Sequence, residues 1–202
     1  MVQDGIRRCV AELEGAHAVG STRKSFGLSA LARWAKQADS TSKKGWRKRF
    51  SAEVHLLCGL RQAYGWIERA TGGGAFRPLY ATFLRDAARV TDEARLAEAA
   101  ELVAENGRVW SELATWMLDP SIPMLAQCRA ELDAAAWPEP MASAHAWCAR
   151  SAEIPSDWAE SFYPGLAGRL VELHAREVRA KDLLEGIVGR AESPESRDSP
   201  TD

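Results

Sequence analysis

The sequence predicts an all-α fold, a single-domain bundle of about seven to eight helices. No stretch shows the alternation of apolar and polar residues that marks a half-buried strand. Ala, Leu, Glu and Arg, which all favour helices, dominate the chain. Apolar residues recur at steps of three and four, the spacing of one buried helix face. The chain has 202 residues, 46% hydrophobic and 27% charged, which is enough to bury one core.

Polar or glycine-rich breaks separate the first four expected helices. We expect helices over residues 2–14 and 26–37 and, after the polar stretch ADSTSKKG, a long third helix over 50–71. Three consecutive glycines then interrupt the pattern, and a fourth helix follows with Pro78 in its first turn, where a missing N–H costs no hydrogen bond. Its apolar stripe predicts one buried face, formed by Phe76, Tyr80, Phe83, Leu84, Ala87 and Ala88.

The fifth helix follows a cap at Thr91 and Asp92 and carries the seam of a packed helix pair. The seam alternates steps of three and four through Leu96, Ala99, Val103, Asn106, Trp110, Leu113 and Met117. Asn106 interrupts it. If Asn106 is buried, it needs a hydrogen-bond partner, either another side chain or a bound ligand.

The carboxyl-terminal part predicts three more helices. A sixth lies between Pro120 and Pro138, a short seventh covers 142–150, and the last begins after Pro164 and ends near Arg190. We expect residues 1–191 to form the helical bundle domain. Residues 192–202, polar and rich in Ser and Pro, are expected to form a disordered tail.

A basic segment at residues 22–50 is hidden within a net charge of only −2. Nine basic residues stand there against Asp39 alone, and a field of this sign attracts acidic partners. The candidate docking residues are Arg23, Lys24, Lys43, Lys44, Arg47, Lys48 and Arg49. The alternative is a solvated charged loop beside a helix start. A polar loop followed by a very long helix does not match a helix-turn-helix, which argues against nucleic acid as a partner.

Signals for catalysis, metals or cofactors are absent from the sequence, and we predict none of the three. Cys9, Cys58, Cys128 and Cys148 are scattered without a CxxC pair, and no apolar run could cross a bilayer. We therefore expect a cytoplasmic protein with reduced thiols and no membrane contact. A Cys–His nucleophile pair stays open, because such partners meet in space rather than in sequence.

The stretch TGGGAFR is the remaining candidate site. A glycine-rich turn before a helix exposes backbone N–H groups at the positive end of the helix dipole, which suits a phosphate or carboxylate. Arg77 could add a charged contact to such an anion. The alternative is a turn that only reverses the chain, with Arg77 paired to a carboxylate such as Glu68. The predicted ligand-binding residues are Gly72, Gly73, Gly74, Arg77 and Asn106.

Two stretches, TGGGAFRPLYATFLRDAA and LAEAAELVAENGRVWSELA, carry a family resemblance. They resemble the helical domain of unknown function in the carboxyl-terminal half of butirosin biosynthesis protein H and its relatives. The matching motif residues are Gly72, Gly73, Gly74, Phe76, Arg77, Leu79, Tyr80, Phe83, Leu84, Ala87 and Ala88, followed by Trp110 and Leu113. Asp86 stands where the family usually has Glu.

Relatives of that kind typically add a papain-like domain, and butirosin protein H transfers an acyl group from an acyl carrier protein to an aminoglycoside. The present sequence shows none of the papain-like motifs. The resemblance therefore implies an accessory helical domain of natural-product acyl transfer that binds substrate or carrier without catalysing alone. Its partner would be an acidic acyl carrier protein or a separate papain-like catalytic subunit. Two alternatives stay open: a self-sufficient acyltransferase or peptidase-like enzyme that uses its own cysteine, and a helical binding protein outside acyl transfer.

Overall fold

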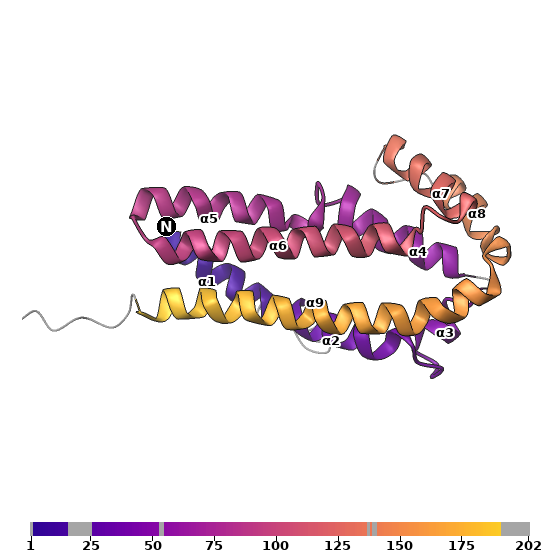
Figure 1. The fold of residues 1–202 in the computed structure, drawn as a ribbon, viewed down its shortest axis with the longest axis horizontal. Coiled ribbons are helices and arrows are strands. Elements are labelled where there is room, and N and C mark those ends of the chain that lie inside the picture. Colours follow the sequence, from indigo (N-terminus) through magenta and orange to yellow (C-terminus); the bar gives the residue numbers. More distant parts are fainter. Residues whose placement is uncertain (1, 16–25, 53–54, 137, 139–140, 191–202) are drawn as a thin grey trace, which may run out of the picture.

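The helices lie in two layers that run along the long axis of the molecule (Figure 1). The computed structural model describes residues 2–15, 26–52, 55–136, 138 and 141–190, which contain nine α-helices and no strand. The all-α prediction is thus confirmed. The expected tail at 192–202 and the basic residues Arg23 and Lys24 lie outside the described residues.

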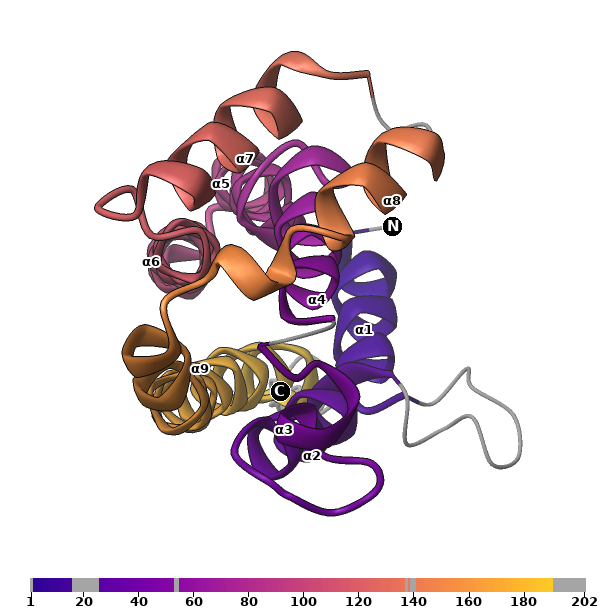
Figure 2. The same cartoon turned by 90° about the vertical axis from the view of Figure 1, so that its right-hand side faces the viewer.

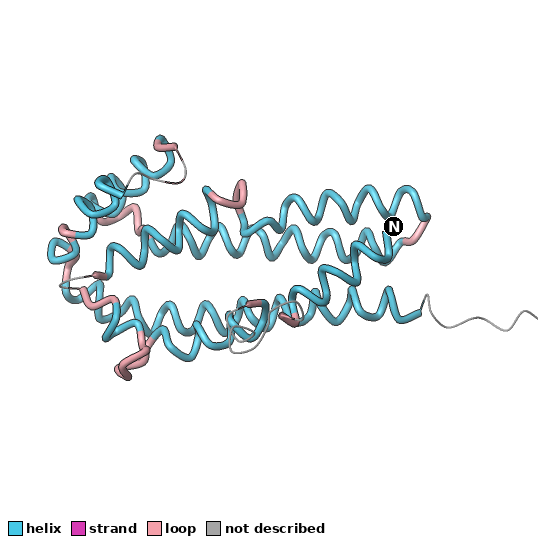
Figure 3. The backbone as a smooth tube through the Cα atoms, turned by 180° about the vertical axis from the view of Figure 1, so that it is seen from behind, coloured by secondary structure: helices cyan, strands magenta, loops and turns pink. Residues whose placement is uncertain are grey.

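One layer contains α4, α5 and α6, the other contains α2, α3 and α9, and α1 packs against α9 and α2 (Figures 1 and 2). Helices α7 and α8 cover one end of the bundle. The bounds are α1 Val2–Leu13, α2 Gly27–Ala38, α3 Trp46–Arg49, α4 Leu56–Tyr64, α5 Arg77–Thr91, α6 Ala94–Met117, α7 Pro123–Ala134, α8 Met141–Cys148 and α9 Ser156–Arg190. Short loops join most of these helices, and one of them projects between α4 and α5 (Figure 3).

A polar layer divides the core into two hydrophobic clusters. On α6 the buried residues up to Val103 belong to one cluster and those from Trp110 onward to the other. On α9 the division falls between Leu173 and Ala180. The buried residues at this level are Asn106, Gly107 and Glu177, so the interior of the bundle is polar at one height.

The predicted seam of the fifth helix is confirmed. All seven of its positions in α6, Asn106 included, are buried. Steps of three and four keep these side chains on one buried face of α6, which packs against both α5 and α9.

The predicted buried face of α5 is wrong in part. Phe76 is 54% and Phe83 36% exposed, whereas Ala81, Leu84 and Ala87 form the buried face. Phe76 precedes the helix in a left-handed conformation, with φ of 66°, so helical periodicity does not govern the direction of its side chain.

The long third helix is wrong as well, because the chain is non-helical at Phe50. The hydroxyl of Tyr163 on α9 donates to the Phe50 carbonyl at 2.8 Å, where a continuous helix would use that carbonyl for itself. Helix α4 begins only at Leu56, and a π-helical turn, Gly65–Arg69, extends it.

The last helix begins at Ser156, nine residues before the earliest predicted start at Gly165, and contains Pro164. A proline cannot donate to the carbonyl four residues earlier, which leaves the carbonyl of Glu160 without its helical partner. Arg47 lies beside this turn, with Nη2 3.5 Å from the Glu160 carbonyl and Nη1 2.7 Å from the Glu160 carboxylate. Tertiary contacts thus support the helix where sequence rules would end it.

Candidate functional site

The TGGGAFR stretch forms a turn in which every residue from Gly72 to Phe76 has a positive φ. Gly74 lies so close to α6 that a Cβ on it would stand 2.8 Å from the carbonyl oxygen of Gly107. Two glycines on neighbouring segments therefore let the backbones touch. The last two residues of the run, Ala75 and Phe76, adopt the same conformation without being glycine, which costs energy that the surrounding packing must offset.

Arg77 is paired within the chain. Its Nε donates to Oε1 of Glu177 on α9 at 3.0 Å, and its Nη1 donates to the carbonyl of Ala75 at 2.7 Å. The indole N–H of Trp110 donates to the same Oε1 at 2.7 Å. Glu177 is only 2% exposed and the Arg77 side chain 24%, so a partly buried ion pair fastens the glycine turn to α9.

The carboxylate suggested for Arg77, Glu68, has a different role. Its Oε1 accepts from the backbone N–H of Gly74 at 3.3 Å and from the hydroxyl of Ser111 at 2.7 Å. Carboxylates of the chain itself therefore occupy two of the donors predicted for an anionic ligand, the N–H of Gly74 and the Nε of Arg77. The expectation of a phosphate or carboxylate ligand finds no vacant donor at Gly74 or at the Arg77 Nε.

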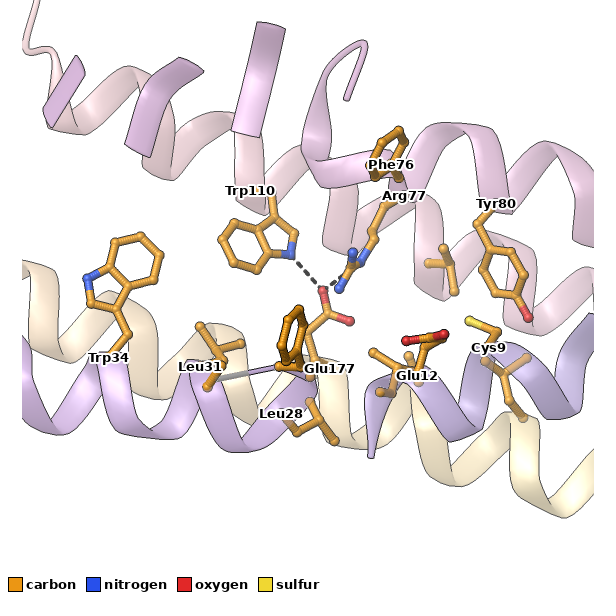
Figure 4. A pocket seen from close by; sticks show the side chains of 17 residues that line it. Cys9, Glu12, Leu28, Leu31, Trp34, Phe76, Arg77, Tyr80, Trp110 and Glu177 are labelled. Carbon is orange, nitrogen blue, oxygen red and sulfur yellow. Dashed lines mark hydrogen bonds and ion pairs between the residues drawn. The ribbon is translucent and has the colours of Figure 1, made fainter. Parts of the chain in front are cut away.

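A cavity of about 830 Å³ lies beside this ion pair, between the two layers (Figure 4). Side chains from α1, α2, α5, α6 and α9 line it together with Phe26 and Phe76, and most of them are apolar. Its described polar groups are those of Cys9, Glu12, Arg77, Tyr80 and Glu177 and the indole N–H groups of Trp34 and Trp110. Trp34 Nε1 and the Tyr80 hydroxyl are buried without a partner among the described residues. The volume is within the range of small-molecule sites, which are typically apolar with a few convergent polar groups.

Cys9 and Tyr80 lie at one end of this cavity (Figure 4). Burial raises the pKa of the Cys9 thiol, an effect that the nearby Tyr80 hydroxyl and Arg77 only partly offset. Burial, with the neighbouring thiol, also raises the pKa of Tyr80. Both groups are therefore protonated at neutral pH, and Cys9 lacks the thiolate character of a nucleophilic cysteine. None of the described residues that line the cavity is a histidine.

A second cavity of about 590 Å³ shares Trp34 and Trp110 with the first. Trp46, Phe50 and Trp66 contribute to its largely aromatic wall. The Trp46 ring lies 5.7 Å from that of Trp34 and 4.7 Å from that of Phe50. The indole rings of Trp34 and Trp110 thus lie between the two cavities and line both of them.

Asn106 is completely buried, and neither its Nδ2 nor its Oδ1 has a hydrogen-bond partner among the described residues. It does not line either cavity, although Val103 and Trp110 on the same face of α6 line the larger one. The structure therefore places Asn106 in the polar layer next to the cavity, beside Gly107, whose backbone packs against Gly74 of the glycine turn.

The described part of the basic segment divides into structural and exposed residues. Arg47 is paired with Asp39 at 2.6 Å and with Glu160, and it lies over the ring of Tyr163, so it stabilises the junction of α3 and α9. Lys43, Lys44, Lys48 and Arg49 are exposed. The Arg49 guanidinium lies 5.6 Å from the centre of the Phe50 ring.

Sequence reasoning missed Glu177, Cys9 and Tyr80 as site residues. A signal for Glu177 existed, because it occupies the apolar seam of α9 between Leu173 and Ala180, as Asn106 does in α6. A charged residue in such a seam requires a buried partner. Cys9 has no comparable signal, since a cysteine in an apolar stripe reads as a small core residue.

A family profile described as Domain of unknown function (DUF4872) matches residues 1–140. The match includes the glycine turn, Arg77 and Trp110 and ends before α9, which supplies Glu177. No curated protein and no solved structure matches the chain. The described residues contain no helix that is long and apolar enough to cross a membrane. They also contain no group of three or more His, Cys, Asp or Glu side chains suited to hold a metal ion.

Proposed function

The chain belongs to the family described as Domain of unknown function (DUF4872), and from this premise we propose that it is a ligand-binding helical domain. Its ligand is a largely apolar small molecule, such as the acyl chain of a donor or product, held between the two helix layers. The single observation that carries the proposal is the cavity of about 830 Å³, lined by five helices. An apolar space of this size in the centre of a bundle suits a ligand better than it suits an unfilled core, which proteins pack closely.

The proposed setting is natural-product acyl transfer in the cytoplasm, with this domain as an accessory that does not catalyse alone. The resemblance of TGGGAFRPLYATFLRDAA to the helical domain of butirosin biosynthesis protein H-like acyltransferases supports this setting. The protonated thiol of Cys9 and the absence of histidine from the described cavity wall support binding rather than catalysis.

Titration with N-methyldecanamide, a neutral ten-carbon acyl amide, tests the binding proposal. Because Trp34 and Trp110 line the cavity, ligand binding should change tryptophan fluorescence. Ala30→Phe places a phenyl ring in the cavity and should weaken binding by about tenfold or more, since the ring competes for the same space. Ala32→Phe is the matched control, because Ala32 lies on the same helix and is exposed. Saturable binding that Ala30→Phe leaves unchanged would place the ligand elsewhere.

A second candidate function, an enzyme with Cys9 as its nucleophile, rests on the presence of Cys9 in the cavity. The two functions differ in one measurement. Incubation with a decanoyl thioester should leave the intact mass of the protein unchanged if the domain only binds. A decanoyl adduct that disappears in Cys9→Ala would favour the enzyme.

Docking of an acidic acyl carrier protein belongs to the same proposal. The exposed side chains of Lys43, Lys44 and Lys48 support it, because they form a positive surface beside α3. Reversal of these three charges to Glu should weaken binding of an acyl carrier protein about tenfold, and added salt should weaken binding to the unmodified chain. The control reverses Arg85 and Arg89, which are exposed on α5. Binding that salt does not affect would refute the docking proposal.

A further inference from the structure

The two carboxylate oxygens of Glu177 have different surroundings. Oε1 accepts both available hydrogen bonds, from Arg77 Nε at 3.0 Å and from Trp110 Nε1 at 2.7 Å. Oε2 accepts none from the described residues. Figure 4 shows Oε2 directed toward the side of the cavity where Glu12 and Cys9 lie. One oxygen of the carboxylate thus serves the fold, and the other faces the cavity.

Oε2 is not among the buried side-chain atoms that lack a partner, so it is accessible from the cavity. Both hydrogen bonds that tie Glu177 to Arg77 and Trp110 use Oε1. A ligand in the cavity can therefore donate a hydrogen bond to Oε2 without breaking either of them.

The charges around the cavity restrict the ligand further. Glu177 and Arg77 form an ion pair in this wall, so neither charge is free to bind an oppositely charged ligand. Cys9 and Tyr80 add no charge at neutral pH, because burial raises the pKa of both. A ligand carboxylate would gain little from Arg77 and an ammonium group little from Glu177, because these two charges already neutralise each other.

Resting on the proposed function, we infer that the cavity selects apolar molecules that carry a neutral hydrogen-bond donor, an amide N–H or a hydroxyl. The donor bonds to Oε2 of Glu177, and the apolar body lies along the aromatic and aliphatic wall between Trp34 and Tyr80. Arg77 acts as a positioning residue, since it holds Glu177 through Oε1 and leaves Oε2 toward the ligand.

Two amides that differ in one N–H test this assignment. N-methyldecanamide has an amide N–H, whereas N,N-dimethyldecanamide has a methyl group in its place. We expect the unmodified chain to bind the first at least about tenfold more tightly, the lower range for a hydrogen bond to a charged acceptor. Decanoate should bind more weakly than N-methyldecanamide.

The variant pair Arg77→Met/Glu177→Gln removes the preference without leaving a buried charge. The Gln carbonyl can still accept from Trp110, while its NH₂ takes the place of Oε2 and cannot accept. The ratio of the two affinities should then fall to within about twofold of unity. Arg85→Met/Glu101→Gln is the matched control, because this exposed pair also joins α5 to another helix and lies away from the cavity, and it should keep the ratio.

The outcomes separate the inference from the proposed function. If both amides bind equally to the unmodified chain, or if decanoate binds most tightly, the inference is wrong and the binding function stands. If the tenfold ratio survives in the Arg77→Met/Glu177→Gln variant, Oε2 is not the acceptor, and the inference is again wrong. If neither amide binds, the proposed function fails and the inference fails with it.

Discussion

Removal of the Arg77 guanidinium should destabilise the fold severely. In Arg77→Met the side chain keeps a similar length, but Glu177, 2% exposed, retains only the hydrogen bond from Trp110. Removal of one partner from a buried ion pair costs about 3–5 kcal/mol. The carbonyl of Ala75 also loses its bond from Nη1, which adds about 1 kcal/mol. Because the Arg77 side chain is itself 24% exposed, the total should lie at the lower end of this sum, at about 4 kcal/mol. This is a large fraction of the 5–15 kcal/mol typical of a domain.

Urea unfolding followed by tryptophan fluorescence, with calorimetry beside it, measures this cost. Each kcal/mol shifts the melting temperature of a chain of this length by about 2–4 °C, so we expect a fall of about 10 °C. Arg77→Met/Glu177→Gln should recover most of the loss, because it leaves no uncompensated charge in the interior.

A loss below about 1 kcal/mol in Arg77→Met would refute the reasoning, since it would mean that Glu177 is not held as a buried charge. A double variant as unstable as the single one would refute it differently, by showing that Arg77 acts through packing alone. The control pair Arg85→Met/Glu101→Gln is exposed and should cost no more than about 1 kcal/mol.

Three further predictions concern the polar layer, the glycine turn and the thiol. Asn106→Leu should raise the free energy of unfolding, measured in urea, by about 1–2 kcal/mol, because it removes two buried polar atoms without partners among the described residues. A lower free energy of unfolding would show that these two atoms form hydrogen bonds in solution. Gly74→Ala should cost about 2–3 kcal/mol, since the φ of Gly74 is +55° and the new Cβ would stand 2.8 Å from the Gly107 carbonyl oxygen. Gly168 on α9 has open space around it, so Gly168→Ala should stabilise the fold by about 0.5–1 kcal/mol. Equal effects of the two glycine substitutions would contradict the close approach. Alkylation of Cys9 by iodoacetamide can be followed by peptide mass spectrometry. At pH 8 it should be slower in the folded than in the unfolded chain, and it should accelerate only above the ordinary thiol pKa of 9.0, because burial raises the pKa of this thiol. Rapid labelling at pH 7 would contradict a protonated, buried Cys9.

The helices and the α6 seam could be predicted because periodicity is a property of neighbouring turns. The seven seam positions from Leu96 to Met117 lie on one helix, and each reports the same buried face. The ends of the helices were less predictable. Local sequence rules place a helix boundary at Pro164, whereas Pro164 lies inside α9 in the structure. Tyr163 and Arg47 contact the backbone at the two places where those rules failed, at Phe50 and at Glu160.

The candidate site could be predicted only in part. The sequence alone singled out Arg77 and the glycine turn, and it offered a carboxylate of the chain as an alternative partner of Arg77. It could not choose between Glu68, nearby in the sequence, and Glu177, which is 100 positions away. It also could not show the cavity, because five helices from distant parts of the chain enclose it.

The sequence by itself determined the helical class, the buried seam of α6 and the need of Asn106 and Arg77 for partners, since each follows from the chemistry of one residue in a local pattern. The tertiary structure alone decided that Glu177 meets Arg77 and Trp110, that Asn106 stays without a partner among the described residues, and that a cavity opens beside them. Local periodicity states which face of a helix is buried. Which residue lies opposite depends on how the layers are aligned along their axes, and all the contacts of the fold together set that alignment.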